Sequence, residues 1–324
     1  MRGGAALRGA PGGRSRLGQD FGILGRMLSR RTALLAPLAQ VVVPVHAATP
    51  KMTLCLHQNT SRAAGYRKSL EGWAKAGIKN VELTDNMLDG FLKTDNLAAA
   101  RSVVSDLGLT AVSCAAVIPD LWIQGPDRTA RLDTWKRRCE QFSSFGIPRI
   151  YCPAVTSRKI TAEDYKGALD CIREGGEAAA QFKMAAMIEF ARNSSFIATL
   201  TTSLKLIREA AHPNVHPMLD CYHFWSGLSK FEDLDLLHSG ELMHVHFQDV
   251  PDTPRELLDN TTRLIPGDGI SPLVRILKKL AEKGYSGALS VELFLPEFTQ
   301  GDPQEVAHRI REKAEAVMKQ ARVA

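Results

Sequence analysis

Four apolar runs in the C-terminal half of the chain end in side chains that can bind a cation or move a proton. These side chains belong to Glu189, Asp220, His246 and Glu292. Counting back from each in steps of two gives mostly apolar or small residues, as expected for the inward face of a strand. The pattern predicts that three carboxylates and one imidazole converge at one end of a sheet.

Three converging carboxylates need a positive partner, because they repel one another and lose solvation when buried. Taken singly, each acid is equally well explained as a helix cap or as half of an ion pair. For the set, a divalent metal ion is the simplest partner. Three oxygens and one nitrogen with open coordination positions suit Mn²⁺, Mg²⁺ or Co²⁺ better than structural zinc, which prefers closed tetrahedral cages.

Eight short β-rich runs alternate with amphipathic segments after residue 47, and several of those segments end at Gly in the manner of helix C-caps. No GxGxxG turn follows the first run. This alternation predicts an α/β fold, a (β/α)8 TIM barrel forming a single domain over 48–324, with its site at the C-terminal ends of the strands. A flavodoxin-like sheet with an appended piece is the alternative. The predicted strands are 52–57, 80–84, 109–117, 149–155, 183–190, 216–224, 242–250 and 287–294, and the clearest predicted helices are 66–77, 96–108, 133–146 and 271–284.

Residues 1–47 predict a disordered leader followed by an export signal. They carry seven arginines, no lysine and one acid, Asp20, and so account for the whole net charge of +6. Arg30 and Arg31 precede an apolar run that ends in a small-residue cleavage pattern at 45–47. The paired arginines resemble a twin-arginine signal and predict a periplasmic or secreted protein, although Ala33 stands where that signal prefers Phe and leaves a general secretory signal open. Met27 is an alternative start.

Charge and cysteine content exclude several other classes. Beyond residue 47 the chain has as many acids as bases, which argues against binding to nucleic acid. No later run approaches ~18 consecutive apolar residues, so no stable membrane insertion is expected. The six cysteines form no CxxC pair, and four lie inside predicted strands, which predicts small core residues rather than disulfides.

Four sequence motifs, in order and spacing, resemble the xylose-isomerase-like barrel superfamily of sugar phosphate isomerases and epimerases. They are MIEF, MLDCYHFW, HVHFQD with the later RLIPGDG, and LSVELF, and the resemblance covers about residues 52–320. Hydroxypyruvate isomerase, inosose isomerases and dehydratases, and ketose 3-epimerases belong to this superfamily.

The resemblance implies a role for each residue of these motifs. Glu189, Asp220, His246 and Glu292 correspond to the metal ligands, and His223 corresponds to a contact with a substrate oxygen. It also implies that Glu189 and Glu292, on opposite faces of the substrate, move a proton through an enediolate while the metal holds a carbonyl and its neighbouring hydroxyl.

Two positions depart from this pattern or match it loosely. Ser195 stands where ketose 3-epimerases carry another acid, which puts that substrate class in doubt. Arg255 lies roughly where those enzymes keep a substrate arginine, and the alternative is an ordinary solvated arginine in a polar loop.

Further candidates follow the first three predicted strands. His57 and Glu82 are predicted to bond a substrate hydroxyl, with helix capping or ion pairing as the alternatives. Trp122 is predicted to wall a sugar pocket, with loop packing as the alternative. His244 is expected to be a satisfied interior histidine, and the PGDG sequence at 266–269 is expected to form a turn.

The sequence therefore predicts a metal-dependent isomerase or epimerase of a sugar, keto-sugar or cyclitol, with a small carbohydrate as its partner and a homo-oligomer left open. A lyase or dehydratase acting on a keto-inositol or keto-glycoside is the main rival, because an enediolate can also expel a β-hydroxyl or a glycosidic oxygen. A non-catalytic sugar-binding barrel would tolerate loss of one glutamate, so the complete set argues against it. A DNA endonuclease on the same barrel is disfavoured by the balanced charge and by the missing extra histidines.

Overall fold

Eight parallel strands close into a barrel in the computed structural model, which describes residues 51–324. Each strand pairs with the next along the chain, and β8 closes the ring by pairing with β1. The (β/α)8 prediction is confirmed, and the predicted leader and export signal at 1–47 lie outside the described residues. The strands are β1 (Thr53–His57), β2 (Asn80–Thr84), β3 (Thr110–Ala115), β4 (Arg149–Pro153), β5 (Ala185–Glu189), β6 (Val215–Asp220), β7 (His244–His246) and β8 (Ala288–Val291).

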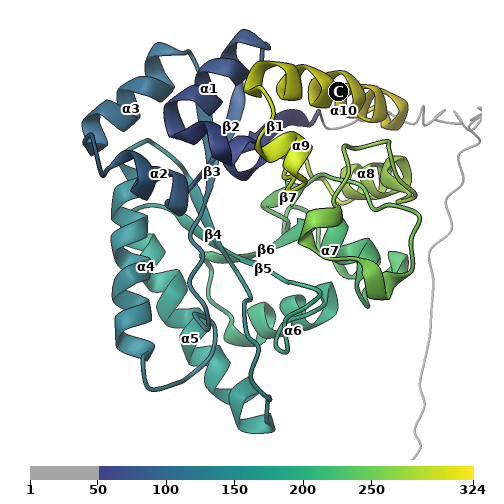
Figure 1. Cartoon of the computed structure of the whole chain (residues 1–324). Coiled ribbons are helices and arrows are strands. Elements are labelled where there is room, and N and C mark those ends of the chain that lie inside the picture. Colours follow the sequence, from purple (N-terminus) through teal and green to yellow (C-terminus); the bar gives the residue numbers. More distant parts are fainter. Residues whose placement is uncertain (1–50) are drawn as a thin grey trace, which may run out of the picture. The chain divides into compact units, whose positions relative to one another are not determined.

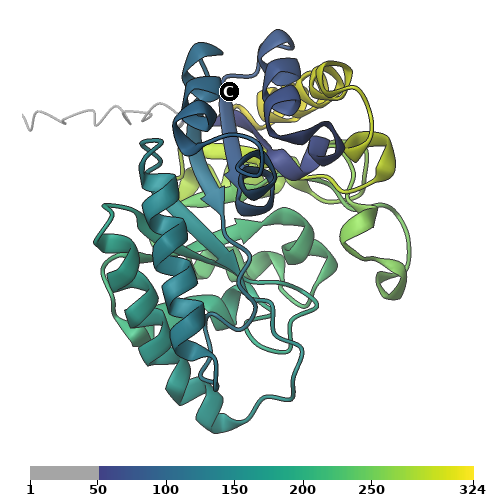
Figure 2. The ribbon, with the colours of Figure 1, turned by 60° about the vertical axis from the view of Figure 1, so that its left-hand side comes forward.

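Helices cover the outside of the barrel, and α4 and α5 run side by side in both views (Figures 1 and 2). The last helix packs on α1 and lies next to β1 (Figure 1). The α-helices are α1 (Gly65–Lys75), α2 (Asp85–Phe91), α3 (Leu97–Asp106), α4 (Arg128–Ser143), α5 (Ala162–Ala180), α6 (Leu200–Ala210), α7 (Cys221–Ser226), α8 (Leu273–Glu282), α9 (Pro296–Thr299) and α10 (Pro303–Ala321). Four short 3-10 helices are η1 (Gln58–Ala64), η2 (Phe231–Leu236), η3 (Arg255–Leu257) and η4 (Asn260–Thr262). No helix within 51–324 combines the length and the apolar character that a bilayer crossing needs.

Strand side chains divide between two layers, as the pleat requires. Ile188 and Leu219 point outward and join the large core between barrel and helices. Their neighbours Met187 and Met218 point inward and pack with Tyr151 in a small apolar cluster inside the barrel. Polar side chains also lie inside the barrel, where Glu82 and His244 are fully buried and 2.9 Å apart.

Glycines end the four helices that the sequence predicted most clearly. Gly77, Gly108, Gly146 and Gly284 follow α1, α3, α4 and α8, and each has a positive φ between 63° and 81°. Only glycine adopts this left-handed conformation without steric cost, which explains why these helices end just before their glycines.

The sixth strand is shorter than the sequence predicts. The run 216–224 was expected to be one strand, but the strand ends at Asp220 and α7 begins at Cys221. The cause is local, because Asp220 Oδ1 accepts the backbone N–H of His223 at 2.7 Å and caps the new helix. All six cysteines are buried and free, as predicted.

Candidate active site

Four side chains meet at the carboxyl ends of β5 to β8. Glu189, Asp220 and His246 are the last residues of β5, β6 and β7, and Glu292 directly follows β8. One ligand atom from each lies within 4.8 Å of the others. His246 Nδ1 is 3.0 Å from Glu189 Oε1 and lies 3.4 and 3.5 Å from oxygens of Asp220 and Glu292. The structure therefore brings together the four residues that the sequence assigned to a metal.

The chemistry of this donor set fits a divalent cation. Glu189 Oε1 and His246 Nδ1 are buried 3.0 Å apart, and within residues 51–324 neither has another hydrogen-bond partner. A buried polar atom that is not fully paired costs about 1–3 kcal/mol, and a cation bound to both would remove that cost. Oxygen-rich sets with one imidazole suit Mg²⁺, Mn²⁺ and Co²⁺.

Arg263 is the principal site residue that the sequence reasoning missed. Its guanidinium is buried, with Nη1 donating to Asp220 Oδ2 at 2.9 Å and to Glu292 Oε2 at 2.6 Å. The rings of Tyr222 and Phe294 lie 5.1 and 5.0 Å from its central carbon. These carboxylates raise the pKa of Arg263 further despite its burial, so it is a permanent cation beside Asp220 and Glu292.

Arg255, predicted to contact substrate, lies elsewhere. Its side chain donates to the backbone carbonyl of Gly227 at 2.6 Å, and the residue is exposed and does not line the cavity described below. The sequence contains a signal that points to Arg263 instead, because Arg263 is the first residue of the family motif RLIPGDG. Arg263, rather than Arg255, is the arginine that reaches the site.

His223 lies one turn beyond Asp220, at the edge of the site. Its Nδ1 lies 3.4 Å from the backbone N–H of Arg192 and its Nε2 lies 3.1 Å from Nη2 of Arg263, and a neutral ring accepts from only one of the two. Burial and the nearby Arg263 charge lower the pKa of His223 to about 4, although Asp220 opposes the shift. His223 is therefore a neutral imidazole at neutral pH, and it lines the cavity.

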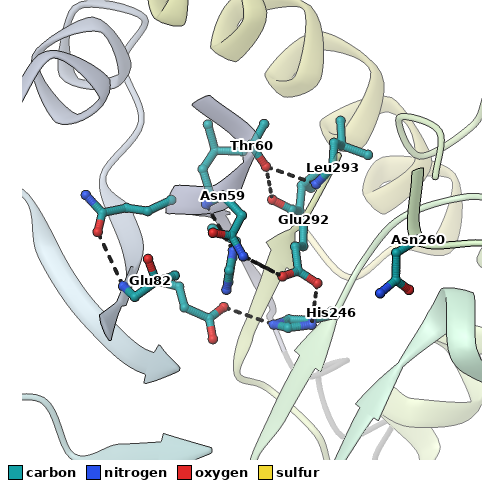
Figure 3. A network of polar contacts seen from close by, with 12 residues as sticks. Asn59, Thr60, Glu82, His246, Asn260, Glu292 and Leu293 are labelled. Carbon is teal, nitrogen blue, oxygen red and sulfur yellow. Dashed lines mark hydrogen bonds and ion pairs between the residues drawn. The ribbon is translucent and has the colours of Figure 1, made fainter. Parts of the chain in front are cut away.

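Glu82 lies inside the barrel beneath His246 and not in the cavity wall, which corrects its predicted contact with substrate. Its Oε2 is 3.3 Å from His246 Nε2 (Figure 3). The same oxygen is 2.9 Å from His244 Nε2. Burial alone would raise the pKa of Glu82, but the two imidazoles outweigh it and lower that pKa. A carboxylate behind a metal-binding imidazole fixes the orientation of the ring and makes it a better ligand.

His57, another predicted substrate contact, is also buried behind the site. The backbone N–H of Asn59 donates to its Nδ1 at 3.2 Å, so the proton sits on Nε2 and points to the Tyr151 hydroxyl at 3.0 Å. Asn59 in turn donates its side-chain N–H to Glu292 Oε1 at 3.3 Å (Figure 3). Asn59 and Tyr151, and not His57 itself, line the cavity.

The two site glutamates differ in their surroundings. Burial raises the pKa of Glu189 to about 7, with His246 opposing the shift. Burial alone would also raise the pKa of Glu292, but His57 and Arg263 outweigh it and that pKa falls. Of the two, Glu189 is therefore the glutamate that is more readily protonated.

A cavity of about 620 Å³ opens above these residues. Glu189 and Glu292 line it, together with His223 and Arg263, whereas Asp220 and His246 are fully buried below it. Among the four ligand residues, only the two glutamates can therefore exchange a proton with a molecule in the cavity.

Trp122, predicted to wall a sugar pocket, belongs to the layer between barrel and helices. Its indole N–H donates to the Cys152 carbonyl at 3.0 Å, and its ring meets that of Trp135 edge-on at 5.7 Å. It also packs on α5 so tightly that a Cβ at Gly175 would lie 2.7 Å from the ring. Trp122 is buried by these contacts and does not line the cavity.

The loop that carries Arg263 is held by Asp249, which is buried just after β7. Asp249 exchanges two backbone hydrogen bonds with Leu264, at 2.9 and 3.0 Å. Its carboxylate accepts the backbone N–H groups of Gly267 and Gly269 at 3.0 Å and of Ser271 at 2.9 Å. These contacts fix the PGDG turn and, through Leu264, the position of the neighbouring Arg263.

Comparisons with known proteins find relatives of this chain. A family model described as a xylose isomerase-like TIM barrel matches residues 70–320. An inosose isomerase of Halalkalibacterium halodurans is 27% identical over 262 residues, which cover 78% of this chain and 92% of that protein. A 3-dehydroshikimate dehydratase of Pseudomonas putida is 24% identical over 231 residues, or 70% of this chain and 36% of that protein.

A solved structure shares the fold. A crystal structure described as the IolI protein with a bound zinc atom superposes with a TM-score of 0.77 at 22% sequence identity. The match covers 83% of this chain and 99% of that one.

Proposed function

This chain belongs to the family of xylose isomerase-like TIM barrels, and we propose that it is a divalent-metal-dependent isomerase or epimerase of an unphosphorylated keto-sugar or keto-cyclitol. The inosose isomerases among its relatives support the reaction class. The absence of a lysine from the cavity lining within 51–324, and the engagement of Arg263 by carboxylates, favour a substrate without a phosphate group.

One observation carries the proposal. Two glutamates face a cavity while their oxygens share a possible cation position with Asp220 and His246, which lie below them. Moving a proton next to a carbonyl needs a base within hydrogen-bond reach and positive charge for the developing oxyanion. The same four side chains provide both.

A divalent cation held by Glu189, Asp220, His246 and Glu292 would supply electrophilic polarisation of the carbonyl and of the adjacent hydroxyl. The protein groups do the rest. Glu189 removes the proton from the carbon next to the carbonyl, which leaves an enediolate, and a proton returned to the neighbouring carbon gives the isomer. If Glu292 delivers a proton to the opposite face of the same carbon instead, the product is the epimer.

Arg263 and His223 hold the oxygens of the reacting molecule. Arg263 places its Nη2 toward Asn260 and His223 at the cavity wall and keeps a full positive charge there. His223 is neutral, so it can bond a hydroxyl without adding charge. Both side chains are buried and therefore hold their positions before a substrate arrives.

Solvent exchange tests the proton-transfer roles. The metal-loaded protein in heavy water is expected to incorporate deuterium next to the carbonyl of a keto-inositol or keto-sugar, as followed by NMR. Glu189→Gln should reduce that rate at least a hundredfold, whereas Glu312→Gln, a matched change on the exposed face of α10, should not change it. Equal rates in Glu189→Gln and wild type would contradict the assignment.

A lyase or dehydratase on the same residues is the second candidate, supported by the dehydratase among the relatives. Once the enediolate forms, loss of a β-hydroxyl competes with return of the proton. Product analysis separates the two reactions, because elimination releases water and gives an unsaturated ketone whereas isomerisation conserves mass.

We also propose that the chain is exported, on the basis of the paired arginines and the apolar run before residue 47. A reporter fused after residue 52 should reach the periplasm, and Arg30→Lys combined with Arg31→Lys should retain it in the cytoplasm. Export of the double variant at the wild-type level would contradict a twin-arginine route.

A further inference from the structure

The cavity continues from the metal ligands to a second region, which we name the far end. It is built by residues that follow β2, β3 and β4: Asp85, Asn86, Val117, Val155 and Thr156. None of them belongs to the donor set or contacts Arg263 by a hydrogen bond. The far end therefore needs a separate explanation.

Two exposed valines give the far end an apolar surface. Val117 is 50% exposed and Val155 is 42% exposed, and both line the cavity. Sugar-binding sites combine such apolar surfaces, against which the C–H face of a ring packs, with a few fixed polar groups.

The polar groups of the far end are fixed by backbone contacts. Asp85 Oδ2 accepts the backbone N–H of Val117 at 3.0 Å, and Asp85 Oδ1 accepts that of Asn86 at 2.8 Å. Each carboxylate oxygen has a second lone pair, which can accept a hydroxyl proton. The carboxylate is thus oriented in advance, as a hydroxyl-binding group must be.

The charges of the far end exclude an anionic ligand. No Lys or Arg of the described chain lines it. Arg138 lies nearby, but it bonds Asp89 through Nη1 at 2.6 Å and Nη2 at 2.5 Å and lies 4.0 Å from Asp85 Oδ2 through Nε, so these two acids balance its charge. A phosphate at the far end would be repelled by the Asp85 carboxylate and would find no unpaired cation there.

The far end begins directly beside the metal ligands. The Asn86 amide donates to Asn59 Oδ1 at 3.4 Å, and Asn59 donates to Glu292 Oε1 at 3.3 Å. One side chain therefore separates the two regions. The whole cavity of about 620 Å³ falls within the range of about 300–1,000 Å³ that encloses drug-sized ligands, and a single six-membered ring fills only part of it.

We propose that the far end is a subsite for a second, uncharged ring, so that the preferred substrate is a keto-sugar glycoside rather than a free or phosphorylated keto-sugar. The keto ring occupies the metal side, and the second ring lies on Val117 and Val155 with its hydroxyls on Asp85 and Asn86. This inference rests on the proposed function for the identity of the reacting ring.

Matched substrates test the inference. The rate of deuterium uptake per unit concentration is measured on the metal-loaded full chain with 3-keto-glucose, 3-keto-glucose 6-phosphate and 3-keto-cellobiose carrying the keto group on its non-reducing ring. The expected result is an efficiency at least tenfold higher for the disaccharide than for either single-ring compound. Val117→Phe, which fills the far end, and Asp85→Asn should each lower the disaccharide-to-monosaccharide ratio at least fivefold, whereas Asp133→Asn on the exposed face of α4 should not.

The two proposals fail in different ways. Equal efficiency on one and two rings, or an unchanged ratio in Val117→Phe, overturns the subsite and leaves the proposed function intact. If no keto compound exchanges, the proposed function is wrong, and calorimetry with the unreactive sugars glucose and cellobiose then decides on the subsite. Cellobiose binding at least tenfold more tightly than glucose supports it, and equal or absent binding overturns it.

Discussion

Replacing Asp249 by Asn should release the loop that carries Arg263. The Asp249 carboxylate accepts three N–H groups from the loop, those of Gly267, Gly269 and Ser271, and is itself buried. The amide of Asn keeps one acceptor oxygen and places an NH₂ group where the other stood. In either orientation of the amide two N–H groups would then face a donor, those of Gly267 and Gly269 or those of Ser271 and Val250.

The cost follows from the kind of bond that is lost. A hydrogen bond to a charged group contributes about 1.5–3 kcal/mol, so two lost bonds correspond to about 3–6 kcal/mol. Water reaches Gly267, which is exposed, and offsets part of that loss. We therefore expect the free energy of local opening of residues 263–271 to fall by about 3 kcal/mol, which raises the open population more than a hundredfold.

Hydrogen exchange measured by mass spectrometry reports this opening directly. Peptides that span 263–271 should exchange about a hundredfold faster in Asp249→Asn, while peptides from β1 to β4 keep their wild-type rates. Asp268→Asn is the matched control in the same turn, because its partner Lys313 is on the surface and such pairs contribute about 0–1 kcal/mol. Equal exchange in the two variants would refute the role given to Asp249.

Two further predictions test the corrected residues. Glu82→Gln should weaken the binding of Mn²⁺ about 10- to 100-fold, measured by calorimetry, because it removes the carboxylate behind His246; unchanged affinity would show that Glu82 does not support the imidazole. Trp122→Phe should lower the free energy of unfolding by about 1–3 kcal/mol, since it leaves the Cys152 carbonyl without its indole partner. Mn²⁺ affinity should stay the same in Trp122→Phe, and a loss of affinity with no change in urea midpoint would place Trp122 in the site after all.

The convergence of Glu189, Asp220, His246 and Glu292 could be predicted because it obeys a simple geometric rule. Parallel strands in a closed barrel deliver their last inward side chains to one end, so Glu189, Asp220 and His246 had to meet if the strands were placed correctly. Glu82 seemed to follow the same rule. It is the third of five residues in β2, however, so its side chain lies below the barrel mouth and reaches His246 from beneath.

Loop residues were harder to predict because no periodicity locates them. Arg255 and Arg263 lie in the same long loop between β7 and α8, and only the motif RLIPGDG, which begins at Arg263, distinguishes them in the sequence. The backbone bridge between Asp249 and Leu264 determines which arginine reaches the site, because it holds Leu264 near the end of β7 and so places the neighbouring Arg263 in the site. Trp122 also lies in a loop, but its side chain turns away from the site, and its indole N–H donates to the carbonyl of Cys152 in β4.

Titration of the chelator-treated full chain with Mn²⁺ tests the central claim most directly, because the proposed chemistry depends on a cation held by these side chains. Wild-type protein should bind one Mn²⁺ per chain at this site. Asp220→Asn should lose that binding, while Asp133→Asn, its exposed counterpart on α4, should bind as wild type does. Absence of binding in the wild type, or full binding in correctly folded Asp220→Asn, would contradict the assignment of Glu189, Asp220, His246 and Glu292 as a metal centre.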